Sequence, residues 1–330
     1  MRPFTYSRPV DLAEAIHTGQ RQPQSKYLGG GTNLVDLMKM GVERPAHLVD
    51  ITRLPMAQIE ERAGGLHIGA MARNSEVAAH AAVRRRYPVL SHSILSGASP
   101  QIRNMATIGG NLLQRTRCYY FYDPGYTECN KRTPGSGCAA ILGYNRIHAI
   151  LGVSEHCITA YPGDMAVALA ALEAEVMLRG PQGERSLPID RFYRLPADTP
   201  NVENEMQRHE IITAVALPAA SADKRSYYIK VRDRNSYAFA LVSVAAVLDI
   251  GAGNRVRQAR IALGGIAPKP WRALEAEEAL ANQPAEEHSF RNAAQLAVRD
   301  ARPHRDNAFK IKLAHNAIVR ALMAATNEPV

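Results

Sequence analysis

The alternation of hydrophobic and polar positions near the start of the chain predicts a parallel β–α–β unit. Residues 25–28 predict a strand that runs into a glycine-rich turn at 29–33. Apolar positions at helical spacing then predict a helix over 34–40, and a second apolar strand is predicted over 46–51. A strand, tight turn, helix and second strand form the smallest module that builds a parallel sheet.

The pattern farther along the chain predicts two structural units. In the first unit we expect strands at 66–70, 175–179, 184–187 and 211–217, helices at 11–19, 75–82, 89–95 and 164–172, and a loop over 98–113. A small, polar stretch at 218–224 indicates a boundary. Beyond it we expect strands at 227–231, 240–248 and 256–263, followed by helices at 272–281, 290–299 and 307–323. Strands followed by helices indicate an α+β class.

Composition narrows the class of protein. The chain has 330 residues, 46% of them hydrophobic and 22% charged, which suits a globular protein of two or three domains. No apolar stretch approaches 18 residues, so no membrane span is expected. The N-terminus lacks the apolar region of a signal peptide, so we expect cytoplasmic location or co-export to the periplasm with a partner that carries a signal. The net charge of +9 is scattered, which favours a solvated or protein-docking surface over nucleic-acid binding.

All four cysteines fall within one irregular stretch. They lie between Cys118 and Cys157, a span of 40 residues, and the other 290 residues contain none. Glycines and prolines between them predict a long loop that needs something to order it. Four thiolates form a complete ligand shell for zinc or an iron–sulfur cluster. Two disulfides, or free structural thiols, are the alternatives that the residues alone leave open.

Two glycine-rich stretches precede the cysteines. The first, over 26–34, places three consecutive glycines between a predicted strand and a predicted helix, where backbone N–H groups can hold a pyrophosphate. The second, over 101–112, offers Gly109 and Gly110 between two short polar side chains. Taken alone, the first stretch is more often a flexible turn, and the second is consistent with an ordinary glycine-rich connection. Together, with the cysteines immediately after, they indicate an electron carrier with two redox groups.

These motifs resemble a known family. Residues 28–39 and 106–112, in this order, resemble the FAD-binding medium subunits of the molybdenum hydroxylases, which include xanthine dehydrogenase, carbon monoxide dehydrogenase and bacterial aldehyde oxidoreductases. Residues 162–166, 228–232 and 263–266 resemble further parts of the same subunits. The cysteine segment resembles the insert in the flavin subunit of the periplasmic aldehyde oxidoreductase type, which binds an additional 4Fe–4S cluster.

The resemblance implies a fold and a set of site residues. It implies a two-subdomain α/β FAD-binding domain of the PCMH type over 1–220, with a cluster-binding insert over 115–160. It also implies a small α+β domain over 224–325, like the C-terminal domain of the CO dehydrogenase flavoprotein, with an antiparallel sheet and helices. The implied FAD ligands are Lys26, Leu28, Gly29, Gly30, Gly31, Thr32, Asn33, Leu34, Thr107, Ile108, Gly110, Asn111, Asp164 and Lys230. The implied cluster ligands are Cys118, Cys129, Cys138 and Cys157. Their spacing is unlike a compact cysteine motif and by itself supports no cluster type.

The function implied is electron transfer within a complex, with no catalytic acid or base on this chain. Substrate would be oxidised at a molybdenum cofactor on a large subunit, and electrons would pass through 2Fe–2S clusters on a small subunit to FAD here and then to an external acceptor. We expect a heterotrimer or a higher assembly. One rival interpretation is a stand-alone flavoenzyme; another is a non-catalytic assembly subunit with a zinc- or cluster-stapled loop. The sequence names neither the aldehyde or heterocycle nor the acceptor.

Two histidines flank the segment before the last cysteine. His148 and His156 are candidates to donate a hydrogen bond to a ligand of the cysteine site. The tyrosines and phenylalanine at 119–122 are expected to pack around a cofactor and exclude water.

Overall fold

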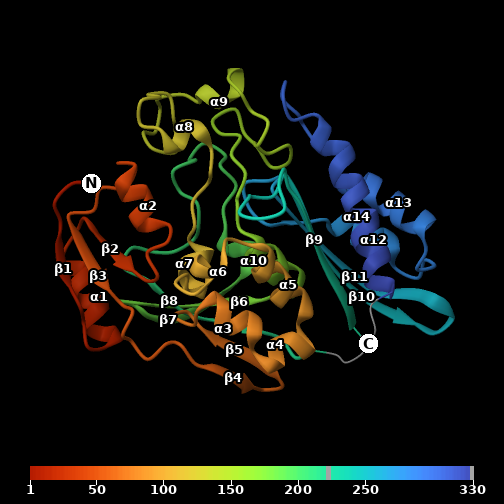
Figure 1. Cartoon of the computed structure of the whole chain (residues 1–330), viewed down its shortest axis with the longest axis horizontal. Helices are drawn as coiled ribbons and strands as arrows, with labels where there is room; N and C mark the ends of the chain where they lie inside the picture. Colours follow the sequence, from red (N-terminus) through yellow and green to blue (C-terminus); the bar gives the residue numbers. More distant parts are fainter. Residues whose placement is uncertain (221–223, 328–330) are drawn as a thin grey trace.

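A computed structural model of the chain describes residues 1–220 and 224–327 (Figure 1). The boundary predicted at 218–224 therefore lies partly outside the described residues. Three sheets form the framework, and short helices join and cover them. None of the helices in the described ranges has the length and hydrophobicity needed to span a membrane.

The first sheet contains the predicted parallel unit. Its elements are β1 (Thr5–Ser7), α1 (Leu12–Arg21), β2 (Ser25–Leu28), α2 (Leu34–Lys39) and β3 (His47–Asp50), with parallel strands in the order β1-β3-β2. The β–turn–α–β prediction is confirmed. Helix α1 continues through Gly19 to Arg21, which the prediction of an end at Gly19 missed, because Gly19 is buried inside the helix. His47 in β3 is structural, since the hydroxyls of Thr5 and Ser7 hold its ring.

The second sheet is antiparallel and carries the glycine loops. Its strands are β4 (Ile59–Arg62), β5 (Gly65–Gly69), β6 (Glu175–Gly180), β7 (Gly183–Pro188) and β8 (Ile211–Leu217), in the order β4-β5-β8-β6-β7. The helices of this part are α3 (Asn74–Ala79), α4 (Ala81–Arg86), α5 (Pro88–Ser96), α6 (Pro100–Arg103), α7 (Ile108–Leu112), α10 (Asp164–Ala171) and α11 (Ile189–Phe192). The single helix predicted over 75–82 is wrong, because extended backbone at His80 divides it. The loop predicted over 98–113 is also wrong, since Ser99 and Thr107 each cap a short helix there.

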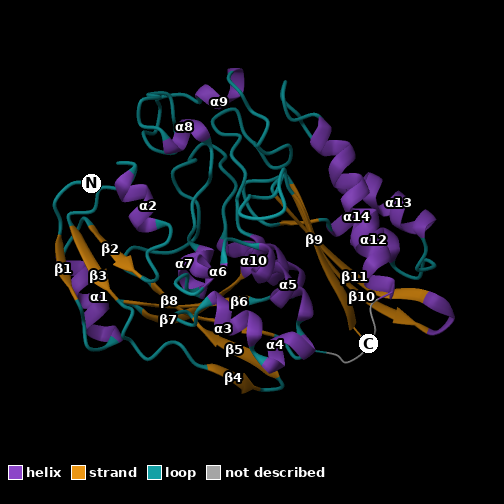
Figure 2. Ribbon diagram, in the orientation of Figure 1, coloured by secondary structure: helices purple, strands orange, loops and turns teal. Residues whose placement is uncertain are grey.

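The third sheet and its helices confirm the predicted α+β pattern. Strands β9 (Lys224–Val231), β10 (Val242–Gly251), β11 (Arg255–Gly264) and β12 (Trp271–Arg272) are joined in the order β12-β11-β10-β9, with a short turn η1 (Ala252–Asn254), and are followed by α12 (Leu274–Leu280), α13 (Glu287–Ala297) and α14 (Phe309–Asn327). Figure 2 shows these three helices gathered beside the sheet.

Strand β10 is buried on both faces. Val244 and Ala246 belong to the core under α12–α14, whereas Ala245 and Val247 belong to the core that contains α5 and α10. Side chains alternate between the faces of a strand, so a continuous apolar run is required where both faces are covered. The C-terminal sheet is thereby packed directly on the rest of the molecule.

The segment 115–160 has little regular structure. It contains only α8 (Tyr119–Tyr122) and α9 (Ala139–Leu142). Figure 1 shows it at the top of the view, between α2 on one side and the start of α14 on the other. A small core joins it to α2, because Leu37 packs with Phe121, Ala140 and Ile158.

A candidate FAD cleft beside a four-cysteine site

A cleft of about 630 Å³ lies where the two glycine loops meet α10 and β9. This volume is within the range of sites for cofactors and other small molecules. The predicted FAD ligands that line it are Thr32, Asn33, Gly110, Asn111, Asp164 and Lys230. The other predicted ligands, which do not line it, are Lys26, Leu28, Gly29, Gly30, Gly31, Leu34, Thr107 and Ile108. The structure thus brings together side chains from four separate elements.

The two glycine loops pack on one another without room for side chains. A Cβ at Gly30 would collide with the carbonyl oxygen of Met105, which belongs to the second loop. Gly31 has a φ of 74°, in the left-handed region that residues with a side chain rarely adopt. Gly30 and Gly31 therefore allow the first loop to pack against the second and to turn, so that the next residues, Thr32 and Asn33, line the cleft.

Several other predicted ligands also support the loops. The Thr107 hydroxyl accepts a hydrogen bond from the Gly110 backbone N–H at 3.2 Å and so caps α7. Ile108 is buried in the core. Lys26 is half-exposed and lies 3.7 Å from a Glu43 carboxylate oxygen. Thr107 and Ile108 thus stabilise the second loop, Lys26 lies at the surface, and none of the three lines the cleft.

Two asparagines at the cleft have buried polar atoms without a partner among the described residues. They are Nδ2 of Asn33 and Oδ1 of Asn74, and both residues line the cleft. A buried polar atom without a hydrogen bond is costly, so this cleft suits a polar ligand. Asn74 was not predicted from the sequence, because it begins α3 and belongs to neither glycine motif.

A buried ion pair closes the far side of the cleft. Lys230 Nζ of β9 lies 2.7 Å from Asp164 Oδ2, and the Tyr228 hydroxyl donates to Asp164 Oδ1 at 2.7 Å. Lys230 Nζ also donates to the Ser96 carbonyl at 3.1 Å. Burial, followed by the charge of Asp164, raises the pKa of Tyr228 well above its ordinary value, so the hydroxyl stays protonated and keeps donating. This pair joins α10 to the C-terminal sheet.

The four cysteines lie near one another in the segment beside the cleft. Cys118 lines the cleft itself, and Cys129 and Cys138 face one another in an isolated antiparallel bridge. Cys118, Cys129 and Cys157 are buried and Cys138 is half-buried. All four are free thiols, so the disulfide alternative is not seen in this structure.

Backbone amides surround two of the sulfurs. Burial raises the pKa of Cys118 to about 12, while hydrogen bonds from the Phe121 and Tyr120 amides act in the other direction. The nearby sulfurs of Cys157 and Cys129 raise the pKa of Cys118 further. Burial likewise raises the pKa of Cys138. A buried thiolate is therefore stable here only when a positive partner such as a metal takes the place of the proton.

The cysteine arrangement does not suit a single ion. Among residues 1–220 and 224–327, no three His, Cys, Asp or Glu side chains are close enough together to bind one metal ion. A tetrahedral zinc site holds each sulfur about 2.3 Å from the metal, so its sulfurs lie within about 4 Å of one another. A cubic cluster spreads its four thiolates over four irons and needs no such close approach.

Cys118 contacts the buried His148, which in turn contacts the buried Lys310. His148 Nε2 lies 3.1 Å from Cys118 Sγ, and His148 is almost fully buried. Burial, together with the charge of Lys310, lowers the pKa of His148 to about 4. The Lys310 ammonium donates to the carbonyls of His148 at 2.9 Å and Gly265 at 2.7 Å. The other candidate, His156, instead faces Asp198 at the surface.

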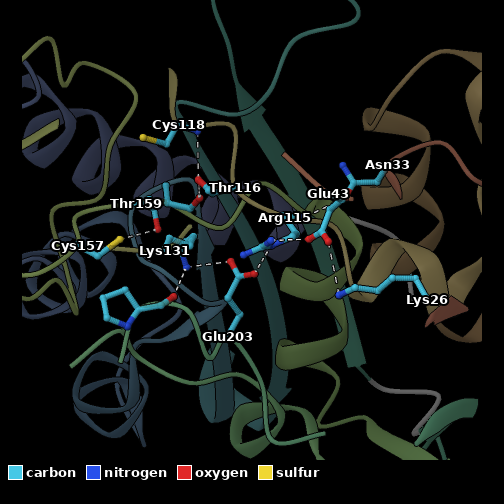
Figure 3. Close-up of polar contacts among 12 residues, drawn as sticks. Lys26, Asn33, Glu43, Arg115, Thr116, Cys118, Lys131, Cys157, Thr159 and Glu203 are labelled. Atoms are coloured by element: carbon cyan, nitrogen blue, oxygen red, sulfur yellow. Dashed lines mark hydrogen bonds and ion pairs between the residues drawn. The ribbon is translucent and has the colours of Figure 1, made fainter. Parts of the chain in front are cut away.

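Ion pairs and a hydrogen bond join the cysteine segment to Glu43, Glu203 and the first glycine loop (Figure 3). Arg115 bonds Glu43 at 2.6 Å and Glu203 at 2.5 Å, and its backbone N–H donates to Asn33 Oδ1 at 3.1 Å. Lys131, deep in the segment, bonds the other Glu203 oxygen at 2.9 Å. Glu203 is thus shared by two cations of the segment. Its pKa lies below the ordinary value: burial opposes this shift, but the charges of Lys131 and Arg115 outweigh burial.

The fold and cleft define a flavin-binding subunit, and comparisons with known proteins define its family. Residues 2–220 match the FAD binding domain in molybdopterin dehydrogenase, and residues 226–325 match the CO dehydrogenase flavoprotein C-terminal domain. The chain belongs to this family as an FAD-binding medium subunit of the molybdenum hydroxylases, and it is an oxidoreductase subunit of a type that acts within a complex.

Individual relatives match over nearly the whole chain. The aldehyde oxidoreductase FAD-binding subunit PaoB of Escherichia coli is 49% identical, over 98% of this chain and 99% of that protein. The carbon monoxide dehydrogenase medium chain of Hydrogenophaga pseudoflava is 27% identical, over 98% of this chain and 96% of that protein. A solved structure of carbon monoxide dehydrogenase from the same organism, which lacks the Mo-pyranopterin moiety, has a TM-score of 0.77 and 27% identity and covers 98% of both chains. The predicted fold class is confirmed.

Proposed function

We propose that this chain is the FAD- and iron–sulfur-containing electron-transfer subunit of a molybdenum-dependent aldehyde oxidoreductase complex. The observation that carries the proposal is that residues of both glycine loops and Cys118 line one and the same cleft. The full-length similarity to an aldehyde oxidoreductase FAD-binding subunit supports the substrate class. The proposed partners are a large molybdenum-cofactor subunit and a small 2Fe–2S subunit.

The residues present suit FAD. Unpartnered polar atoms on Asn33 and Asn74, one a donor and the other an acceptor, suit the polar groups of a dinucleotide. The Lys230–Asp164 ion pair adds two buried charged groups to the wall of the cleft. FAD supplies the redox chemistry, because it exchanges electrons singly or in pairs. The protein residues bind it, fix its orientation and limit its contact with water.

The four cysteines suit a 4Fe–4S cluster. They are free and mostly buried, and amide N–H groups point at the sulfurs of Cys118 and Cys138. Hydrogen bonds of this kind stabilise ligating thiolates and set the cluster potential. The stand-alone flavoenzyme has no observation in its favour.

An absorption spectrum and an activity assay test the proposal. The purified chain is expected to show flavin bands together with a broad iron–sulfur shoulder. The chain alone is expected not to oxidise aldehydes with any artificial acceptor, whereas the complex reconstituted with its two partner subunits is expected to do so. Aldehyde turnover by the chain alone would favour the stand-alone flavoenzyme, and a protein without flavin would overturn the assignment.

A further inference from the structure

Lys310 is a buried cation with no acidic partner among the described residues. Its side chain is fully buried, and both of its hydrogen bonds go to backbone carbonyls, those of His148 and Gly265. Burial, followed by the nearby positive charge of Arg146, lowers the pKa of Lys310 to about 7. An ammonium group is expensive to bury unless negative charge lies close by.

The proposed cluster supplies negative charge at this place. Four thiolates carry more negative charge than an iron–sulfur core offsets, and reduction adds one more electron. The Lys310 ammonium bonds the carbonyl of His148, and the ring of the same His148 reaches Cys118 Sγ. One residue therefore separates the buried cation from a proposed cluster ligand.

His148 is placed to donate to that ligand. A thiolate bound to iron has no proton and only accepts, so a 3.1 Å contact from His148 Nε2 to Cys118 Sγ requires the hydrogen to be on Nε2. The other ring nitrogen, Nδ1, is buried and has no partner among the described residues, as suits the nitrogen that lacks the hydrogen. His148 thus adds a side-chain donor to the amides that already point at Cys118.

We propose that His148 and Lys310 raise the reduction potential of the 4Fe–4S cluster, His148 by hydrogen bonding to Cys118 and Lys310 by the positive charge it carries when protonated. The inference rests on the proposed function, because it requires a cluster at the four cysteines. Hydrogen bonds to sulfur and nearby positive charge both favour the reduced, more negative cluster. Both are positioning residues, which act on the cluster through Cys118 and through the local field.

If Lys310 had only a structural role, removing other hydrogen bonds to the same backbone would shift the cluster potential equally. Asn307 provides the matched control for this. The Asn307 side-chain amide is also fully buried and donates to the carbonyls of His148 at 3.4 Å and Ala149 at 3.2 Å. Asn307→Ala removes hydrogen bonds to the same backbone but no charge. For His148, the pair His148→Gln and His148→Leu separates the donor from the packing, because glutamine places an N–H near the position of Nε2.

The test is a redox titration of the 4Fe–4S signal by electron paramagnetic resonance, in the complex with its partner subunits. Lys310→Met and His148→Leu are each expected to lower the reduced-to-oxidised ratio at fixed applied potential at least tenfold, which is about 59 mV for a one-electron couple. Asn307→Ala and His148→Gln are expected to titrate with the unchanged protein.

The outcomes separate this inference from the proposed function. A cluster that titrates identically in the unchanged protein and in both Lys310→Met and His148→Leu overturns the inference and leaves the proposed function intact. An equal shift in Asn307→Ala also overturns it, since packing would then explain the effect. A complex without any 4Fe–4S signal overturns both. If Lys310→Met does not fold, the His148→Leu and His148→Gln pair decides the outcome.

Discussion

The glycine-loop region and the cysteine segment are built in different ways. The glycine loops lie between strands and helices of two packed cores, and their conformation depends on backbone contacts such as that between Gly30 and Met105. The cysteine segment has two four-residue helices and a small core, and it is held by shared ions such as Glu203. The first region keeps its shape by packing, whereas the second depends on charge and, we propose, on iron.

The largest expected effect concerns the cysteines. Cys129→Ser or Cys138→Ser is expected to remove or degrade the cluster and to increase proteolysis within 118–157, because the cluster orders a segment with few packed elements. Most of the FAD is expected to stay bound, since the glycine loops lie outside the segment. Iron content, flavin content and limited proteolysis measure this.

Ser136→Ala is the matched control for the cysteine variants. The Ser136 hydroxyl accepts a hydrogen bond from the Cys129 backbone N–H at 3.0 Å, so this change disturbs the same turn but keeps all four thiolates. Full iron content in Cys129→Ser or Cys138→Ser would contradict the assignment of these thiolates as ligands. Loss of iron with unchanged protease resistance would show that the segment is ordered without a cluster.

The second prediction tests the packed end through its buried ion pair. Asp164→Asn leaves the Lys230 ammonium, whose side chain is 3% exposed, without its counter-ion. Breaking such a pair costs about 3 kcal/mol of unfolding free energy, measured by denaturant titration. Glu287→Gln, in an exposed pair with Arg291, is the control and is expected to cost less than about 0.5 kcal/mol. Equal losses in the two variants would contradict the role of Asp164.

The third prediction separates the two cofactors. Gly31→Val introduces a side chain at a φ of 74° beside the Val35 side chain, so it should distort the loop and lower FAD occupancy sharply. The iron content of the complex should stay largely unchanged. Gly253→Val carries the same backbone strain at a φ of 68°, outside the cleft, and should keep its FAD. A Gly31→Val variant with full flavin would refute the loop assignment.

The smallest effect is expected at the junction between the two regions. Glu203→Gln weakens the bonds to Arg115 and Lys131 and should cost about 2 kcal/mol of unfolding free energy. Because the pKa of Glu203 is lowered by folding, its contribution is present above the ordinary pKa of a glutamate and is lost as the pH falls through the lowered value.

A stability profile measured from neutral to acidic pH checks the Glu203 prediction. The stability difference between the unchanged protein and Glu203→Gln should shrink as the pH falls below about 4.5. A difference that stays constant to the lowest pH at which the protein folds would mean that charge on Glu203 does not hold the segment. Glu184→Gln, in an exposed pair with Arg179, serves as the control.

The sequence predicted the elements well where an apolar pattern decides the structure. The β–turn–α–β unit and the α+β order of the C-terminal part depend on the packing of apolar side chains. Such packing leaves a pattern of apolar residues in the sequence, as in the buried run of β10. The short helices α6 and α7 were missed, because single capping side chains at Ser99 and Thr107 start them. A cap of this kind leaves no apolar periodicity.

The sequence predicted only those cleft residues that lie beside a recognisable local motif. Thr32, Asn33, Gly110 and Asn111 are contiguous with glycine runs, and they line the cleft. Asn74 and Lys310 were missed, because their importance depends on contacts with residues distant in sequence. Lys310 meets His148 across 162 positions, and nothing near it in the sequence indicates that its charge is buried.

The central claim is that one chain carries FAD in its cleft and a 4Fe–4S cluster at the four cysteines beside it. Native mass spectrometry of this subunit, released from the purified complex, tests it most directly. The account predicts a mass equal to the chain plus one FAD plus one Fe₄S₄ unit. A subunit that carries FAD alone, or zinc without sulfide, or a mass lowered by two disulfides, would contradict it.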